Sequence, residues 1–394
     1  MLHALGSAAP DPIIRLMQDF TADPRADKVD LGVGMYRDGE GRTPVMAAVR
    51  AAEARLLAAQ ETKGYLGLAG DPAFHAGMRD LLLGTAAAAA RVAAAGTPGG
   101  TGALRQALEL VRRANPGARV WLSAPTWPNH PALVRAAGLA PATYRYYDAA
   151  SGGIDRAGMR ADLEGAAPGD VVLLHGCCHN PTGADLMPGD WADLAVMCER
   201  RGAVPLIDMA YLGFAEGIDA DAAGLRLMAA SLPEVLIAAS GSKSFGLYRE
   251  RVGCVLAICE SAPVRDAAAA MLATLNRECY AFPPDHGARV VTTILADAAL
   301  RADWAAELEA MRARLARLRQ GLAEALRDAA GSDRFGSLAA QRGMFSLIGA
   351  DPDQVERLRA THGLYLIGDG RINLAGLREA DIPRVARAIA AELA

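Results

Sequence analysis

Short apolar runs alternate with helical segments through the middle of this chain. Residues 171–175 and 204–208 are apolar up to the polar residue that ends each run, and a further apolar run covers residues 235–239. Strands that are apolar along their whole length are typical of a parallel sheet whose two faces are both covered by helices. We therefore expect an α/β fold with a largely parallel sheet.

Polar residues stand where these apolar runs end. Asp208 ends one run, Asn180 lies in the loop after residues 171–175, and Lys243 follows residues 235–239. In open parallel sheets the ligand binds at the carboxyl ends of the strands. Three separate parts of the sequence are thus expected to converge on one crevice.

Lys243 is unusual in composition as well as in position. The chain has 41 lysines plus arginines, but the lysines are only Lys28, Lys63 and Lys243. A desolvated lysine amine can lose its proton near neutral pH and form an imine, whereas a guanidinium stays protonated. Lys243 is therefore a candidate nucleophile, although a surface lysine in a loop of serine and glycine explains this stretch better when it is taken alone.

A glycine-rich turn at residues 99–102 precedes a helix that we expect to run to about Ala114. Free backbone N–H groups and the positive dipole end make such a turn suitable for a phosphate. No Gly-Lys-Ser/Thr follows, which argues against a nucleotide P-loop. An ordinary turn between a strand and a helix is an equally good interpretation. The Gly-x-Gly at residues 32–34 is a poor dinucleotide fingerprint, because no third glycine follows it.

A lysine that can form an imine, an aspartate at a strand end and a phosphate-sized turn together suggest pyridoxal 5'-phosphate. Asp208 would keep the pyridine nitrogen of this cofactor protonated. Tyr211 and Asn180 could hydrogen-bond its phenolic oxygen, although both residue types are also common in turns and caps. Ser240, Ser242 and Arg251 would join the glycine turn around the phosphate, and Arg251 offers bidentate geometry.

Composition limits the other classes of function. A net charge of -4 with 22% charged residues gives no reason to expect nucleic-acid binding. No run approaches the roughly 20 apolar residues of a membrane span, and the first residues lack the pattern of a signal peptide, so we expect a cytoplasmic protein without membrane contact. We expect no metal site and reduced thiols, because no metal-like spacing occurs among the six cysteines, which are Cys177, Cys178, Cys198, Cys254, Cys259 and Cys279.

The length of 394 residues predicts two domains, one of them large. We assign residues 1–45 to an N-terminal arm with part of a small domain, residues 46–308 to a large cofactor-binding domain, and residues 309–394 to the small C-terminal domain. A long charged segment at residues 301–327 is expected to form a helix that bridges the two domains.

Several motifs resemble those of the class I, fold type I aminotransferases that act on aspartate and aromatic amino acids. They occur in the order of that family over nearly the whole chain, and they are Gly100-Thr101-Gly102-Ala103-Leu104-Arg105, Pro125-Thr126-Trp127, His179-Asn180-Pro181-Thr182-Gly183, Asp208-Met209-Ala210-Tyr211, Ser240-Gly241-Ser242-Lys243-Ser244-Phe245-Gly246 and Gly370-Arg371-Ile372-Asn373-Leu374. The resemblance implies a large domain with a mostly parallel seven-stranded sheet between helices, and a small α/β domain.

The resemblance also implies a role for each matching residue. Lys243 would form the Schiff base with pyridoxal 5'-phosphate and carry protons, and Trp127 would stack on the pyridine ring. Tyr65 would reach the phosphate of the neighbouring subunit in a homodimer. The remaining cofactor-binding residues would be Gly100, Thr101, Asn180, Asp208, Tyr211, Ser240, Ser242 and Arg251.

By the same resemblance, Arg371 would pair with the substrate α-carboxylate, helped by Gly34 and Asn180. Trp127 would also face the substrate. Arg277 would reach across the dimer to the distal carboxylate of aspartate or glutamate, and would swing aside for an aromatic side chain.

The segments 176–180 and 282–287 look most like those of bacterial aromatic amino acid aminotransferases. The implied reaction moves the amino group of phenylalanine, tyrosine, tryptophan or aspartate to 2-oxoglutarate, in two half-reactions linked by pyridoxamine phosphate. A dedicated aspartate aminotransferase is the nearest alternative. A non-catalytic regulatory domain that binds the cofactor would need a DNA-binding extension, which we do not expect here, and a carbon–sulfur lyase fits Arg277 and Arg371 less well.

Two residues depart from the family pattern. Gly99 stands where a phosphate-binding serine is common, and Ser244 stands where asparagine is usual. We expect weaker retention of the cofactor from these departures, but not loss of activity.

Overall fold

The computed structural model describes residues 1–4, 6 and 12–393. The described residues form two compact units. The larger unit comprises residues 44–180 and 184–314, and the smaller unit comprises residues 1–43, 181–183 and 315–394. Part of the N-terminal arm that the sequence predicts, at residues 5 and 7–11, lies outside the described residues. The domain boundaries assigned from the sequence stay a prediction.

The larger unit is built on a seven-stranded sheet with the strand order β2-β10-β9-β8-β7-β3-β4. Strand β10 is antiparallel to both β2 and β9, and the other neighbouring pairs are parallel. The expected mostly parallel seven-stranded sheet is thus confirmed. Its strands are β2 (Val92–Pro98), β3 (Arg119–Ala124), β4 (Ala140–Arg145), β7 (Val171–His175), β8 (Val204–Met209), β9 (Val235–Ser240) and β10 (Val252–Ile258).

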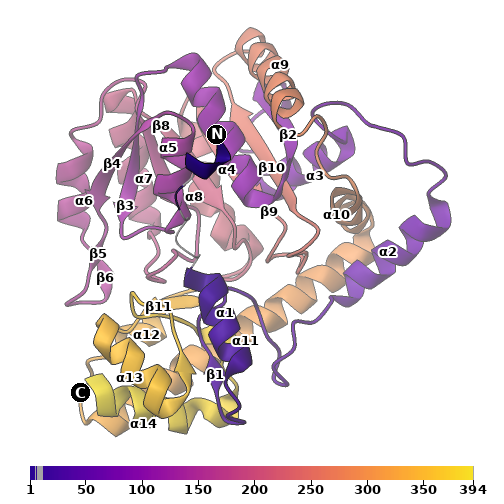
Figure 1. Cartoon of the computed structure of the whole chain (residues 1–394). Helices are drawn as coiled ribbons and strands as arrows, with labels where there is room; N and C mark the ends of the chain where they lie inside the picture. Colours follow the sequence, from indigo (N-terminus) through magenta and orange to yellow (C-terminus); the bar gives the residue numbers. More distant parts are fainter. Residues whose placement is uncertain (5, 7–11, 394) are drawn as a thin grey trace. The chain divides into compact units, whose positions relative to one another are not determined.

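Helices pack around this sheet (Figure 1). Helix α4 contacts α5 and α9, whereas α8 contacts α3 and α7. A short ribbon of β5 (Tyr147–Asp148) and β6 (Gly153–Ile154) precedes α6. The helices are α2 (Ala47–Ala59), α3 (Pro72–Leu83), α4 (Gly99–Ala114), α5 (Asn129–Ala136), α6 (Arg156–Leu163), α7 (Pro188–Arg201), α8 (Ile218–Ser231), α9 (Ala262–Cys279) and α10 (His286–Ala296).

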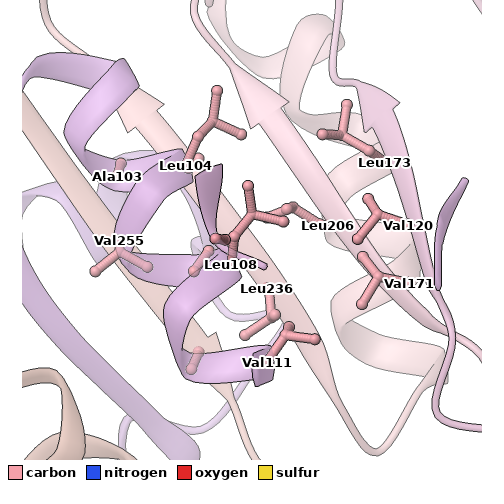
Figure 2. Packing of buried hydrophobic residues seen from close by; sticks show 14 of the residues in the cluster. Ala103, Leu104, Leu108, Val111, Val120, Val171, Leu173, Leu206, Leu236 and Val255 are labelled. Carbon is pink, nitrogen blue, oxygen red and sulfur yellow. The ribbon is translucent and has the colours of Figure 1, made fainter. Parts of the chain in front are cut away.

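The main core of the larger unit lies where α4 packs on the sheet. Leu104, Leu108 and Val111 are spaced to lie on one face of α4, and each is at most 8% exposed. Figure 2 shows these side chains beside Leu206 and Leu236 of the neighbouring strands. Burial of one such leucine contributes about 1.5–3 kcal/mol, so this contact fixes α4, and with it the glycine turn that begins the helix.

The smaller unit combines helices with short strand pairs. Strand β1 (Val29–Asp30) pairs in parallel with β12 (Leu364–Tyr365), and β11 (Phe345–Leu347) pairs antiparallel with β13 (Arg371–Asn373). The long helix α11 (Ala298–Ala330) belongs to the larger unit up to Arg314 and to the smaller unit from Leu315 onward. The other helices of the smaller unit are α1 (Pro12–Ala22), α12 (Ser337–Ala340), α13 (Pro352–His362) and α14 (Ile382–Leu393), with short 3-10 turns at Leu2–Ala4, Leu374–Gly376 and Glu379–Asp381.

Carboxylates set the boundaries of two elements. Strand β1 ends at Asp30, because the Asp30 carboxylate accepts hydrogen bonds from the backbone N–H groups of Gly32 and Val33 and turns the chain. Helix α2 begins at Ala47, where the Glu307 carboxylate accepts from the N–H groups of Ala47 and Ala48, which have no partner within the helix.

Candidate active site

The carboxyl ends of β7, β8 and β9 gather the central residues of the predicted site. Asp208 on β8 is paired in register with His175 on β7 and with Ala238 on β9. Asn180 follows β7 in a buried loop, and Ser240 is the last residue of β9. The convergence that the sequence predicts for these strand ends is therefore present.

The Lys243 amine lies in a mostly enclosed position over the ring of Tyr211, 4.8 Å from its centroid. Burial lowers the pKa of Lys243 from its ordinary value of 10.5 to about 8, the charge of Asp208 opposes this change, and the charge of Arg251 adds to it. A minor fraction of this amine is consequently neutral close to physiological pH, which is far more than for an ordinary lysine. A neutral amine is the form that can attack a carbonyl or accept a proton.

Asp208 is held in its ionised form by a hydrogen bond with His130. His130 Nε2 lies 3.1 Å from Asp208 Oδ2. Burial alone would raise the pKa of Asp208, but the hydrogen bond with His130, assisted by the charge of Lys243, brings it below its ordinary value. Asp208 can therefore hold a cationic partner at the end of β8.

The histidines behind Asp208 form a buried relay that the sequence reading missed. Thr126 Oγ1 lies 2.8 Å from His130 Nδ1 and 3.3 Å from His175 Nε2. Burial, reinforced by His130, lowers the pKa of His175 to about 3, so this ring is neutral. His130 and His175 both stand close to strand ends, so the sequence could have marked them as candidate site residues. Only the fold shows that they lie beside Asp208.

A cradle for an anion lies at the N-terminus of the 16-residue helix α4. Arg251 Nη1 donates to Ser242 Oγ at 3.2 Å, and the Ser242 N–H donates to Ser240 Oγ at the same distance. A Cβ atom on Gly100 would come 2.9 Å from Ser240 Cβ, so the turn that includes Thr101 packs directly against β9. Two hydroxyls, a guanidinium and a helix N-terminus in one place suit a phosphate group.

Because Gly99 has no side chain, the Arg251 guanidinium can enter this cradle. Gly99 has a φ of +71°, and a Cβ there would lie 2.2 Å from Arg251 Nη2. The guanidinium thus fills the volume in which a side chain at position 99 would stand. At position 99 a serine hydroxyl is missing, and the Arg251 guanidinium occupies the space instead. The weaker cofactor retention expected from this departure stays a prediction.

Ser244, the second departure from the family pattern, is a buried structural residue. Its hydroxyl donates to the carbonyl oxygen of Leu212 at 2.8 Å, and its own carbonyl accepts from Trp304 Nε1 at 2.7 Å. These bonds connect the Lys243 loop to the segment after Tyr211 and to helix α11. Trp127, which the sequence assigns to ring stacking, lies edge-on to His130 with the ring centroids 5.2 Å apart.

Gly34 and Arg371 meet in the smaller unit around a residue that the sequence reading did not select, Phe345. The Arg371 guanidinium lies 4.4 Å from the centroid of the Phe345 ring and donates to the carbonyl oxygen of Gly32 at 3.1 Å. A Cβ on Gly34 would come 2.9 Å from Phe345 Cζ. The pair predicted to bind the substrate α-carboxylate is therefore brought together.

Tyr65 and Arg277 stand apart from the buried group around Lys243. The Tyr65 side chain is 86% exposed and stacks on Phe282 with the centroids 4.5 Å apart. Arg277 is exposed near the C-terminal end of α9, which ends at Cys279. Both side chains are exposed, and their reach into a second subunit stays a prediction.

The described residues contain no helix that is long and apolar enough to span a membrane. Within the same part of the chain, no group of three or more His, Cys, Asp and Glu side chains is placed to hold a metal ion. All six cysteines are free, and all but Cys279 are buried.

Comparisons with known proteins agree on one family. The sequence model described as "Aminotransferase class I and II" matches residues 26–389. An aromatic-amino-acid aminotransferase of Paracoccus denitrificans is 56% identical over 389 residues, which cover 99% of both chains. An aspartate aminotransferase of Escherichia coli is 44% identical over 397 residues, which cover 100% of both. An aromatic-amino-acid aminotransferase of Burkholderia pseudomallei, solved covalently bound to pyridoxal phosphate, has a TM-score of 0.97 and 43% identity, with 100% of both chains covered.

Proposed function

The chain belongs to the class I and II aminotransferases, and we propose that it moves the amino group of aromatic amino acids and of aspartate to 2-oxoglutarate. The protein is an aminotransferase with the fold type I architecture, as its motifs predict. The observation that carries the proposal is the Lys243 amine, whose pKa of about 8 leaves it partly neutral beside an ionised Asp208.

Pyridoxal phosphate is the cofactor of this family. When bound, it accepts the electron pair that is left when the substrate Cα–H bond breaks. The anion cradle, built from the α4 turn at Gly100 and Thr101 with Ser240, Ser242 and Arg251, fits its phosphate. The ionised Asp208 fits a protonated ring nitrogen, because buried carboxylates need a cationic or hydrogen-bonding partner.

Lys243 is the residue that we propose to bind the cofactor covalently and then to move the proton from the substrate Cα. A general base works best when its pKa lies near the working pH, and burial gives Lys243 that property. Tyr211 lies under this amine and can orient it. Asn180 and Tyr211 would donate to the phenolic oxygen of the cofactor, and Trp127 would cover its ring.

Arg371 would hold the substrate α-carboxylate with two parallel N–H donors, together with the Gly34 backbone and Asn180. A bidentate pair fixes orientation as well as position. An amino acid held in this way presents its Cα–H bond in one direction only, which is the condition for rapid proton transfer.

The preference for aromatic substrates rests on similarity, since the relative at 56% identity is an aromatic-amino-acid aminotransferase. Aspartate stays in the proposal because Arg277 can bind a second carboxylate. A dedicated aspartate aminotransferase is the alternative, supported by the relative at 44% identity.

A homodimer with shared sites is part of the proposal. Three apolar or aromatic side chains are exposed between residues 57 and 66: Leu57 on α2 is 86% exposed, and Tyr65 and Leu66 in the loop after α2 are 86% and 45% exposed. Exposed apolar patches commonly mark interfaces. We also propose a cytoplasmic location and the three-part domain division that the sequence suggests, with amino acids and 2-oxo acids as substrates and with no nucleic-acid or membrane partner.

The test is a single-turnover experiment on the cofactor-loaded enzyme. The enzyme is mixed separately with phenylalanine, tyrosine and aspartate, and the absorbance of the cofactor is followed as it gains the amino group. Conversion by the aromatic substrates as well as by aspartate supports the proposal. Conversion by aspartate alone assigns the chain to the aspartate enzymes, and the absence of conversion by all three substrates contradicts the function proposed for Lys243.

A further inference from the structure

A single buried arginine of helix α11 holds the segment that carries Phe345. Arg319 is 2% exposed. Its guanidinium donates to the carbonyl oxygens of Leu338, Arg342, Gly343 and Phe345 and to the hydroxyl of Ser346, at distances of 2.6 to 3.2 Å. These acceptors span the turn between α12 and β11, so one side chain fixes the path of the whole turn.

The position of β11 then determines the position of β13. Phe345 is paired with Asn373, and Leu347 is paired with Arg371. The Phe345 ring also lies against the Arg371 guanidinium. A shift of this turn would therefore move Arg371 in two ways, through the strand pairing and through the ring contact.

The same strand pair reaches the segment that contains Gly34. The Asn373 amide donates to the carbonyl oxygens of Val33 and Met35, on either side of Gly34. Gly34 itself has no room for a Cβ beside the Phe345 ring. Strand β13, which carries Arg371, therefore also holds the backbone on both sides of Gly34.

The turn also contacts Gly183, which belongs to the same smaller unit. The Arg342 N–H donates to the carbonyl oxygen of Gly183 at 2.7 Å. A Cβ on Gly183 would come 2.5 Å from the carbonyl oxygen of Phe345, so this glycine packs directly on the turn that Arg319 holds.

We propose that Arg319 is the positioning residue of the substrate-carboxylate site, because the turn that it holds fixes the segments carrying Gly34 and Arg371. This inference rests on the proposed function, in which Arg371 and the Gly34 backbone take part in binding the α-carboxylate. Arginine is suited to the role because its planar fork can donate in several fixed directions at once, whereas lysine offers a compact charge with three donors.

The test uses the cofactor-loaded enzyme and 3-phenylpropionate, a substrate-like carboxylate that lacks the amino group. Arg319→Lys keeps the charge and loses the fork, so it is expected to raise the Kd for 3-phenylpropionate about tenfold, since displacements of about 1 Å can cost that much or more. KM for phenylalanine should rise in parallel, while kcat and the affinity for the cofactor change less than about twofold, because the Lys243 group is untouched. Arg317→Lys is the matched control, since the Arg317 side chain on the same helix is 64% exposed.

A milder variant covers the case in which Arg319→Lys does not fold. Ser346→Ala removes one acceptor of Arg319 and the donor to Gln341 Oε1, and it should raise the same Kd about two- to fivefold, as expected for one buried hydrogen bond. An unchanged Kd in whichever of these variants folds overturns the inference.

A double-mutant comparison separates this inference from the proposed function. Arg371→Met should weaken 3-phenylpropionate binding strongly, and Arg319→Lys should add little on that background, because both act on the same contact. Full additivity overturns the positioning role. If Arg371→Met leaves the Kd unchanged, the proposed carboxylate site itself is wrong, and the inference fails with it.

Discussion

Replacement of Lys243 by methionine is expected to stabilise the cofactor-free protein while it abolishes turnover. The Lys243 amine is mostly enclosed, and its pKa is lowered to about 8 by burial, with Arg251 adding to the effect and Asp208 opposing it. Folding must therefore bring a cation into a place that disfavours the charged form. Methionine keeps the apolar stem and carries no charge, so this unfavourable contribution is removed.

The magnitude follows from the two pKa values. A folded-state pKa of about 8 in place of 10.5 corresponds to a penalty of at most about 3 kcal/mol, an upper value because the side chain retains some contact with solvent. Below pH 8 the amine is charged in both the folded and the unfolded state, so the full penalty is present. It falls as the pH rises from 8 to 10.5, and it disappears once both states are neutral.

The assay is urea-induced unfolding of the cofactor-free proteins at equal protein concentration. At pH 7 the Lys243→Met variant should be more stable than the parent by about 2–3 kcal/mol, and at pH 10 this difference should shrink to about 1 kcal/mol or less. Lys63→Met serves as the control, because Lys63 is exposed on a loop and should show no such difference. Equal or lower stability of Lys243→Met at pH 7 would refute the electrostatic argument.

Two further changes test the core and the anion cradle. The Leu108 side chain is 1% exposed between α4 and the sheet. Leu108→Ala should lower the free energy of unfolding by about 2–5 kcal/mol, as measured by urea unfolding. A loss below about 1 kcal/mol would show that the packing is looser than described. Gly99→Ala should raise the Kd for pyridoxal phosphate about tenfold, because it forces a positive φ on alanine and displaces Arg251. Fluorescence titration measures this Kd. Gly189→Ala is the control, because a Cβ at Gly189 meets nothing within 4 Å. Unchanged affinity in Gly99→Ala would mean that Arg251 does not need this space.

The sheet and its strand ends could be predicted because they depend on local patterns. Uninterrupted apolar runs mark β7, β8 and β9, and the rule that ligands bind at the carboxyl ends of parallel strands places Asp208 and Lys243 in one crevice. The start of α2 could not be predicted in this way. For α2 the N-terminal acceptor is Glu307, which lies about 260 residues away in the sequence, and no local pattern contains that information.

The supporting residues of the site were missed for a related reason. Lys243 and Asp208 stand out by residue type, whereas Phe345 and Arg319 look like ordinary core and surface residues in the sequence. An arginine on a helix with many charged neighbours is usually exposed. Only the fold shows that Arg319 is buried and that its donors all converge on one turn.

The pKa values of Asp208 and Lys243 are both lowered, but for different physical reasons. Burial disfavours the charged forms of both groups, yet Asp208 stays ionised because His130 donates to it, while Lys243 has Arg251 as a nearby cation that works against its charge. The charge of Asp208 alone would hold the lysine protonated. The carboxylate remains charged because His130 donates to it, and the amine loses its proton more readily because burial, with Arg251 adding to its effect, outweighs the charge of Asp208. In a simple buried ion pair, the aspartate would keep the lysine protonated. Here Asp208 keeps its negative charge, and Lys243 can still lose and regain its proton.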